Sequence, residues 1–398
     1  MEYRVIKKNG DKISALGFGC MRLASKLGRI DEEKATEQIK YAIDQGVNYF
    51  DTAYPYHGGE SENFLGRVFS DKSLRNKVKI ATKLPPWSVK TREDMDRLLD
   101  DQLSKLQVDS IDYYLVHGIM GQDVWDRLKN LGILEFLDEA IASGKVKNVG
   151  FSCHSNLSTF KNVVDDYDWT MCQIQYNYLD EYIQAGREGL MYAEERDIAV
   201  FVMEPLRGGS LVGKLPKKVE QEWAKSSVKR SPAEWALKWI LNHKEVTCIL
   251  SGMNIDEHIK ENIKVASETE ANSLDKEEIN LIESVRDLYK SLTKIPCTAC
   301  SYCLPCPAGV NIPLSFEKYN DKYMFGTLGA RVMYQVQLNG VMSDGNNMAS
   351  KCVDCGLCES HCPQHIEIRK ELKQVSRELE GIPGKILGAV AKRVMKSS

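Results

Sequence analysis

Short apolar runs alternate along this chain with longer stretches in which apolar residues recur at helical spacing. Each run is five to seven residues long and has the length and the β-branched or aromatic content of a buried strand. The runs are Ala15–Gly19, Val47–Asp51, Val78–Lys83, Ile111–His117, Val146–Ser152, Met171–Tyr176, Ile198–Met203 and Val246–Leu250. Because a helical stretch follows each run, the pattern predicts an α/β fold, a (β/α)8 barrel of the TIM type.

A doubly wound open sheet is the alternative arrangement of the same alternation. It would need a glycine-rich phosphate fingerprint after the first strand, and Gly17-Phe18-Gly19-Cys20 does not continue to a third glycine. The barrel is therefore the favoured prediction.

Local signals mark a hairpin and two of the helix starts. Tyr3–Ile6 and Asp11–Ser14 flank an Asn-Gly turn and predict a hairpin before the first barrel strand. Thr91 precedes Asp94 by three residues, and Ser231-Pro232-Ala233-Glu234 is a capping box with proline at the first helical position.

The composition of the chain changes abruptly at Ile295-Pro296-Cys297. Two helical stretches, at about 256–266 and 276–291, come before that point. We therefore predict a barrel domain at residues 1–290 and a second, mainly helical domain at residues 291–398.

The overall composition excludes several classes of protein. The 398 residues are 43% hydrophobic and 27% charged, and the net charge of −3 gives no electrostatic reason to expect nucleic acid. No apolar run approaches the ~20 residues that a membrane span needs. The stretch Met1–Val5 has no charged-then-apolar leader, so we expect a cytoplasmic location.

The cysteine positions predict iron–sulfur chemistry in the second domain. Eight of the twelve cysteines lie after residue 296, in the series Cys297-x2-Cys300-x2-Cys303-x2-Cys306-Pro307 and Cys352-x2-Cys355-x2-Cys358-x3-Cys362-Pro363. A triple of Cys-x2-Cys steps with a trailing Cys-Pro is the bacterial ferredoxin pattern, in which the fourth cysteine serves the other cluster. Two zinc sites are the alternative, but zinc is satisfied by four ligands from two Cys-x2-Cys pairs.

This pattern predicts two [4Fe–4S] clusters, one on Cys297, Cys300, Cys303 and Cys362 and the other on Cys352, Cys355, Cys358 and Cys306. The clusters either transfer electrons or only hold a small domain together. Two neighbouring clusters are more than a structural role needs, so electron transfer is favoured. The other cysteines are expected to be small buried apolar residues, namely Cys20, Cys153, Cys172 and Cys248.

Four residues with acid–base chemistry lie at the ends of three successive strand candidates. Asp51 ends the second run, Tyr56 follows it after a proline-bearing turn, and Lys83 and His117 end the next two runs. Together they make a proton-transfer set.

These four residues, with Gly17-Phe18-Gly19, Gly58-Gly59-Glu60-Ser61-Glu62 and Gly150-Phe151-Ser152, resemble the aldo-keto reductases over roughly residues 1–290. All four positions of that family's catalytic tetrad match in order. The resemblance implies carbonyl reduction in a barrel whose bottom is closed by the N-terminal hairpin. With its two cysteine series, the chain is similar to the ferredoxin-fused branch of the family.

The resemblance also implies a role for each of the four residues. Reduction of a carbonyl leaves charge on oxygen, so a proton donor is needed, and tyrosine with a pKa near ~10 gives its proton up reluctantly. We therefore expect Tyr56 to be the donor, Lys83 to lower its pKa, Asp51 to orient Lys83, and His117 to polarise the substrate oxygen.

The resemblance also implies contacts to a nicotinamide cofactor. Ser152 and Gln173 match residues that hold the carboxamide, whereas Cys153 stands where the family has asparagine. Met203 stands in the place of a stacking aromatic. The stretch Arg207–Lys214 resembles the loop that covers the pyrophosphate, and the expected cofactor contacts here are Pro205, Leu206, Gly208 and Lys214.

The clamp for the 2′-phosphate departs most from the family. After Gly252, His258 stands near the expected arginine, which weakens the case for NADPH over NADH and leaves room for a flavin such as FMN. Glu261 and Asn262 match the adenine contacts.

Three hypotheses of function remain. The first is an NAD(P)H-dependent oxidoreductase acting on a small carbonyl or alcohol substrate. The second is a flavin- or ferredoxin-linked oxidoreductase whose barrel relays electrons to or from the clusters and an electron-transfer protein. The third is a redox sensor or electron carrier, against which the intact tetrad argues. The loops 119–124 and 179–187, which would select the substrate, carry no readable motif.

Overall fold

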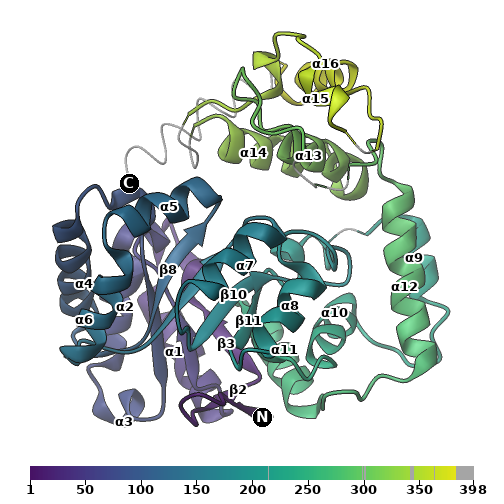
Figure 1. Ribbon diagram of the computed structural model, residues 1–398. Helices are drawn as coiled ribbons and strands as arrows, with labels where there is room; N and C mark the ends of the chain where they lie inside the picture. The colour runs from purple at the N-terminus through teal and green to yellow at the C-terminus, as the bar shows by residue number, and fades with distance from the viewer. Residues whose placement is uncertain (214, 298, 300–301, 341–344, 363, 382–398) are drawn as a thin grey trace. The chain divides into compact units, whose positions relative to one another are not determined.

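All eight predicted strands form, and they close into one parallel barrel (Figure 1). The computed structural model describes residues 1–213, 215–297, 299, 302–340, 345–362 and 364–381. The barrel strands are β3 (Leu16–Gly19), β6 (Tyr49–Asp51), β7 (Lys79–Leu84), β8 (Ile111–Ile119), β9 (Val146–Cys153), β10 (Met171–Gln175), β11 (Ala199–Met203) and β12 (Val246–Ser251). The closed ring excludes the open-sheet alternative, and each strand lies within two residues of its predicted bounds.

The strands pair in the order β10-β11-β12-β3-β6-β7-β8-β9. The register sets Gly19 level with Asp51, Asp51 level with Ala81, and Lys83 level with Leu115. Because all strands are parallel, their carboxyl ends meet at one rim of the barrel. The chemistry-bearing strand ends of the sequence therefore lie on the same rim.

Helices surround the barrel strands, as Figure 1 shows. They are α1 (Glu32–Asp44), α2 (Glu60–Phe69), α3 (Lys72–Arg75), α4 (Arg92–Leu106), α5 (Gln122–Asn130), α6 (Ile133–Ala142), α7 (Leu157–Asp165), α8 (Gly186–Glu194), α10 (Pro232–Leu241) and α11 (Asp256–Glu268). The predicted helix starts are confirmed. Thr91 and Asp94 form a capping box on α4, and the side chain of Ser231 accepts from the backbone N–H of Glu234 with Pro232 in the first turn of α10.

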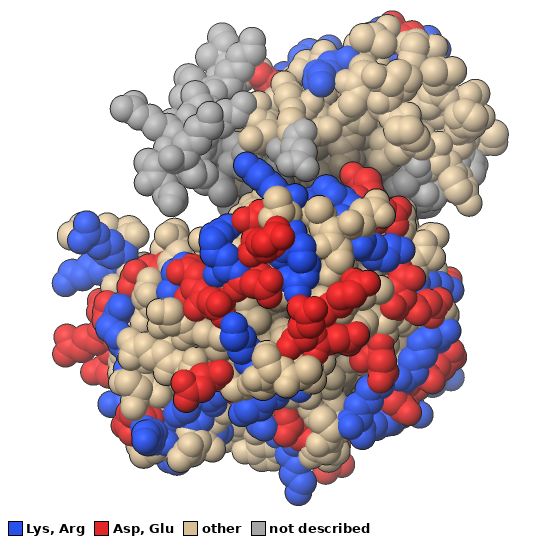
Figure 2. Space-filling view, turned by 60° about the vertical axis from the view of Figure 1, so that its left-hand side comes forward, with Lys and Arg blue, Asp and Glu red and all other residues tan. Residues whose placement is uncertain are grey.

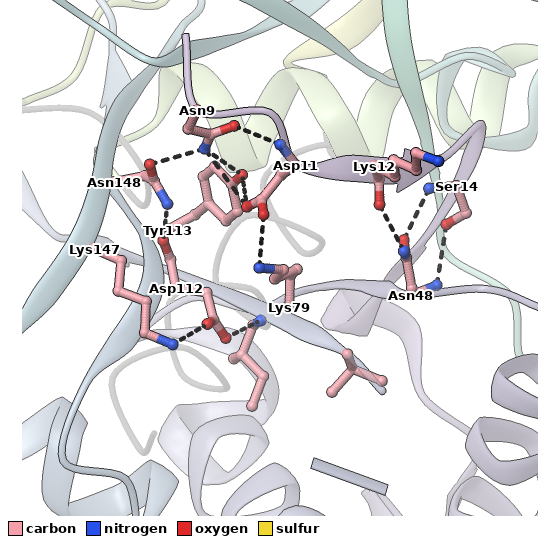
Figure 3. A network of polar contacts seen from close by, with 12 residues as sticks. Asn9, Asp11, Lys12, Ser14, Asn48, Lys79, Asp112, Tyr113, Lys147 and Asn148 are labelled. Atoms are coloured by element: carbon pink, nitrogen blue, oxygen red, sulfur yellow. Dashed lines mark hydrogen bonds and ion pairs between the residues drawn. The ribbon is translucent and has the colours of Figure 1, made fainter. Parts of the chain in front are cut away.

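The predicted hairpin forms from β1 (Tyr3–Val5) and β2 (Lys12–Ser14). Its Ile6 and Ile13 are fully buried in one apolar cluster with Tyr49, Tyr113 and other residues of the barrel interior. Polar contacts join the hairpin to the barrel (Figure 3). The hydroxyl of Tyr113 donates to Asp11 Oδ2 at 2.6 Å, and Lys79 Nζ lies 2.8 Å from Asp11 Oδ1.

The chain divides into two compact units, one of Met1–Val212 with Val228–Ile279 and one of Gly213–Ser227 with the chain from Asn280 onward. The second unit contains α9 (Lys217–Trp223), and α12 (Lys276–Ser291) leads into it. Its remaining described helices are α13 (Ile312–Phe325), α14 (Thr327–Leu338), α15 (Leu357–Ser360) and α16 (Ile368–Leu379). They enclose a core that includes Phe316, Tyr334 and Val375. The predicted domain boundary near residue 290 stays a prediction.

Charges of both signs are mixed over the face of the barrel unit that Figure 2 shows. This mixing agrees with the small net charge of −3. Within the described part of the chain, no helix combines the length and the apolar character that a membrane crossing requires.

Candidate active site

A buried ion pair lies at the carboxyl ends of β6 and β7. Lys83 Nζ is 2.6 Å from Asp51 Oδ1 and donates to the carbonyl of Thr52 at 2.8 Å. Lys83 is 1% exposed and Asp51 5% exposed. Burial acts to lower the pKa of Lys83, but the charges of Asp51 and Tyr56 outweigh it, so that this pKa is raised. Lys83 is therefore held as an ammonium.

Tyr56 begins the short helix η2 (Tyr56–Gly59), directly after β6. Lys83 Nζ lies 5.1 Å from the centroid of the Tyr56 ring. Burial raises the pKa of Tyr56 above its ordinary value, while the charge of Lys83 acts in the opposite direction. Lys83 thus lowers the pKa of Tyr56 as expected, although desolvation of the phenolate outweighs the ammonium.

His117 lies on β8 beside the ring of Tyr56, with the two ring centroids 6.1 Å apart and the planes at 81°. Burial, followed by the charges of Lys83 and His154, holds the pKa of His117 well below its ordinary value, so the ring is neutral. Its Nδ1 is buried and has no hydrogen-bond partner among the described residues. The structure thus brings Asp51, Tyr56, Lys83 and His117 together at one rim.

A second buried network, not anticipated from the sequence, lies behind Lys83. Glu62 on α2 is fully buried and accepts from Thr82 on β7 and, at 2.6 Å, from Gln102 on α4. Gln102 also donates to the backbone carbonyl of Lys83 at 3.1 Å, and Tyr114 donates to Gln102 Oε1 at 2.8 Å. The network fixes the end of β7 that carries Lys83.

The residues expected to hold the carboxamide line the same rim. Gln173 on β10 donates to Asp51 Oδ2 at 2.6 Å, and Ser152 on β9 accepts from the backbone N–H of Gly118 at 2.6 Å. Cys153 is buried at the end of β9, and burial raises the pKa of its thiol to about 12. Cys153 is therefore a neutral thiol, and its expected contact with a cofactor stays a prediction.

The loop after β11 carries the next group of expected contacts. Met203 is the last residue of β11 and is partly buried, Pro205 is buried, and Leu206 precedes the short helix η4 (Arg207–Gly209). Gly208 adopts a φ of 66° and Gly209 a φ of 97°, backbone conformations that favour glycine. Lys214 lies outside the described residues.

The expected contacts after β12 are divided between surface and interior. Gly252 follows β12, and His258 is exposed on α11. Asn262 is buried and donates to Ser251 Oγ at 3.1 Å, and Ser231 donates to a carboxylate oxygen of Glu261. The side chains of Glu261 and Asn262 thus have partners within the protein.

One arginine at the rim was missed by the sequence reasoning. Arg22, at the end of the short helix η1 (Cys20–Arg22), donates to the carbonyl of Gly208 at 3.0 Å. No local signal marks Arg22, because this contact joins segments that are far apart in the sequence. Arg207, the first residue of the stretch expected to cover the pyrophosphate, donates to Asp180 Oδ2 at 2.8 Å, and this ion pair is almost fully buried.

A cavity of about 320 Å³ in the second unit has Cys306, Cys352, Cys355 and Cys358 in its wall, together with Cys303. The first four are the predicted ligands of one cluster. No three His, Cys, Asp or Glu side chains in the described part of the chain are grouped so that they could hold one metal ion.

The other predicted cluster ligands lie near the same core. Cys297, Cys303 and Cys362 are partly buried and pack against the apolar core of the second unit. Cys300 lies outside the described residues. The four remaining cysteines are confirmed as buried free thiols, namely Cys20, Cys153, Cys172 and Cys248.

Comparison with known sequences identifies the barrel. The profile described as Aldo/keto reductase family matches residues 15–287, more than half of the chain. The chain belongs to the aldo/keto reductase family. It is an oxidoreductase of that family with a second domain, because the profile described as 4Fe-4S dicluster domain matches residues 296–367.

Individual members of the aldo/keto reductase family are similar to this chain over half of its length or more. L-galactose dehydrogenase of Arabidopsis thaliana is 27% identical over 323 residues, which cover 74% of this chain and 97% of the relative. An aldo-keto reductase of Schizosaccharomyces pombe, named with NADP(+), is 28% identical over 218 residues, 52% of this chain and 62% of the relative. The holo form of an aldo-keto reductase from Bacillus halodurans shares the fold with a TM-score of 0.61 at 24% identity, over 72% of this chain and 96% of that chain.

Proposed function

We propose that the barrel reduces an aldehyde or ketone to the alcohol with NAD(P)H and that Tyr56 supplies the proton. The observation that carries this proposal is the Asp51–Lys83 ion pair, buried beside Tyr56, whose ring also lies beside His117. Nδ1 of His117 is buried and has no hydrogen-bond partner in the described part of the chain. Two further facts support the proposal. The chain belongs to a family of oxidoreductases, and its four acid–base groups lie at one rim of the barrel.

Proton delivery belongs to Tyr56 in this mechanism. The phenol gives its proton to the substrate oxygen, and Lys83 stabilises the phenolate that remains. Asp51 keeps Lys83 charged, and Gln173 in turn orients Asp51 through its second oxygen. Because burial raises the pKa of Tyr56 in this structure, the charge of Lys83 is needed to offset that burial during the reaction.

His117 polarises the carbonyl as a neutral ring. Its pKa is held well below the ordinary value, so one ring nitrogen carries a hydrogen and can donate to the substrate oxygen. A neutral donor there adds no positive charge beside Lys83. The ring of Trp87, 5.2 Å from that of His117, bounds the same space.

The rim fits a nicotinamide cofactor. The buried Nδ1 of His117 lacks a partner among the described residues, and Gly208 and Gly209 form a turn that leaves backbone close to the surface. When bound, the nicotinamide supplies the hydride. Ser152 and Gln173 would hold its carboxamide and the turn at Gly208 its pyrophosphate, and His258 in place of arginine weakens the preference for NADPH.

Substitution of Tyr56 by phenylalanine tests the mechanism. We expect Tyr56→Phe to lower kcat for aldehyde reduction by about 10²- to 10⁴-fold, because the general acid is lost. Binding of NADPH and NADH, followed by fluorescence, should stay unchanged. Tyr41→Phe, at an exposed tyrosine of α1, is the matched control and should keep full activity.

Full activity of Tyr56→Phe would disprove the mechanism. A flavin released from anaerobically purified protein, together with cluster reduction by substrate, would instead support the second hypothesis, in which the barrel relays electrons.

For the second domain we infer two [4Fe–4S] clusters with the ligand pairing predicted from the cysteine series. The cavity whose wall contains Cys306, Cys352, Cys355 and Cys358 supports the second of these ligand sets, although Cys303 of the first set lies in the same wall. When bound, each cluster takes up or gives one electron. Cys355 is exposed, as are Tyr302, Val353 and Leu357 in the wall of the same cavity. This exposure supports electron exchange with a separate electron-transfer protein.

A further inference from the structure

Arg22 lies where three neighbouring barrel strands end. The helix η1 that it closes follows β3 directly, and β3 is flanked in the barrel by β12 and β6. At the start of η1, the buried thiol of Cys20 lies close enough to Asp51 and Lys83 for their charges to act on its pKa, which burial raises. The short helix therefore leads from the ion pair of the candidate active site to Arg22.

The side chain of Arg22 extends from β3 across the end of β12 to the loop after β11. A Cβ built on Gly252, just after β12, would lie 3.3 Å from Arg22 Cβ and 3.5 Å from its Cγ and Cδ. The guanidinium then reaches η4, where Nη1 donates to the carbonyl of Gly208 at 3.0 Å. The absence of a side chain at Gly252 gives the aliphatic part of Arg22 its path along the rim.

The charge of Arg22 is not neutralised by a carboxylate. Arg22 is exposed, and no Asp or Glu oxygen of the described residues lies within ion-pair distance of it. Its hydrogen bond to Gly208 uses one N–H of a group that has five. The guanidinium therefore keeps donors and a full positive charge for an anion.

We propose that Arg22 binds the pyrophosphate of the nicotinamide cofactor, a role that rests on the proposed function of the barrel. The guanidinium lies against the Gly208 turn, which is the loop proposed to hold that group, and it offers the planar fork that pairs with phosphate oxygens.

The pyrophosphate, rather than the 2′-phosphate, is the group that this placement selects. The guanidinium is tied to the loop after β11, whereas His258 lies on α11, after β12. Arg22 thus acts equally on NADH and NADPH, which share the pyrophosphate and differ in the 2′-phosphate.

The test measures binding of ADP-ribose and of its 2′-phosphate to the anaerobically purified full chain by titration calorimetry. Neither probe carries a nicotinamide, so the readout does not depend on hydride transfer. We expect Arg22→Ala to raise the Kd for both probes by about 10- to 100-fold, since charge-assisted hydrogen bonds are lost. Arg22→Lys should recover part of the affinity, because a point charge replaces the fork.

Arg97→Ala is the matched control. It removes one positive charge from the exposed face of α4, where Arg97 pairs with Asp94 at 2.9 Å, and should change neither Kd by more than about twofold. If Arg22→Ala and Arg97→Ala bind the two probes with equal affinity, the role of Arg22 in binding the pyrophosphate is overturned. That result would not by itself contradict the proposed function of the barrel. A loss confined to the 2′-phosphate probe would overturn the pyrophosphate assignment. Failure of the unmodified protein to bind either probe would overturn the nicotinamide proposal itself and this inference with it.

Discussion

The ammonium of Lys83 is buried in the barrel next to one carboxylate. Removing such a charge from water costs several kcal/mol, and Asp51 at 2.6 Å, with the carbonyl of Thr52, offsets that cost. At the scale of single residues, the candidate active site is therefore also a place where the stability of the barrel depends on charge pairing.

Asp51→Asn should be far more damaging to stability than its size suggests. The amide leaves Lys83 buried without an opposite charge, and we expect a loss of about 3 to 5 kcal/mol in the free energy of unfolding. Denaturant unfolding followed by tryptophan fluorescence measures it, since five of the six tryptophans lie in the barrel unit.

The double variant Asp51→Asn with Lys83→Met separates stability from catalysis. It removes both charges, so most of the lost stability should return, while carbonyl reduction stays abolished because the phenolate of Tyr56 has lost its cation. An Asp51→Asn protein as stable as the unmodified one would show that the ion pair contributes nothing to the fold.

At the scale of elements, a buried carboxyl joins α2, β7 and α4. Glu62 accepts from Thr82 and Gln102, its second oxygen is buried without a partner, and no basic side chain of the described residues forms an ion pair with it. Burial raises its pKa above the ordinary value, and the two hydrogen bonds only partly oppose this. The network that holds Lys83 in place therefore includes a carboxyl group, that of Glu62, whose protonated form is favoured by burial.

Glu62→Gln should change how the stability of the barrel depends on pH. Because the folded protein holds the proton more tightly than the unfolded chain, the contribution of Glu62 is full below about pH 4.5 and is lost as the pH rises through the higher folded pKa. The amide does not titrate. We therefore expect Glu62→Gln to gain stability relative to the unmodified protein as the pH rises above about 4.5, by up to about 1.4 kcal/mol per pH unit until the folded pKa is passed.

Thermal unfolding at several pH values measures this difference. Glu33→Gln, at an exposed residue of α1, is the control and should follow the unmodified protein at every pH. A constant difference between Glu62→Gln and the unmodified protein across this range would mean that Glu62 is ionised in the folded state.

At the scale of the whole molecule, the chain combines an aldo/keto reductase barrel with a 4Fe-4S dicluster domain. The proposed ligand pairing interleaves the two cysteine series, since Cys306 serves the cluster of the later series and Cys362 that of the earlier one. Double substitutions can distinguish this pairing from two separate sites, because the two arrangements differ in which cluster loses a ligand when Cys306 is replaced.

Cys306→Ser combined with Cys355→Ser removes two ligands of one proposed cluster, so the other cluster should remain, with about four irons per chain. Cys303→Ser combined with Cys355→Ser removes one ligand from each and should leave no intact cluster. Iron and sulfide analysis with low-temperature electron paramagnetic resonance measures both. Loss of both clusters from the Cys306→Ser, Cys355→Ser protein as well would contradict the interleaved pairing, because two separate sites would then each have lost one ligand.

The sequence by itself determined the strands and where they end. The alternation of apolar runs and helical stretches is local, and it set all eight barrel strands to within two residues. It also set Asp51, Lys83 and His117 at strand ends, and parallel strands necessarily bring such ends to one rim. The cysteine spacing was equally local and indicated the dicluster domain that the family comparison shows.

Only the tertiary structure decided contacts between segments far apart in the chain. Arg22 and Gly208 are 186 residues apart, and Gln173 and Asp51 122 apart, so no local pattern could pair them. The balance that raises the pKa of Tyr56 was likewise beyond the sequence, which shows the neighbouring cation but not the burial that outweighs it. Burial and long-range pairing depend on how the whole barrel closes, and that closure is a property of the fold rather than of any stretch within it.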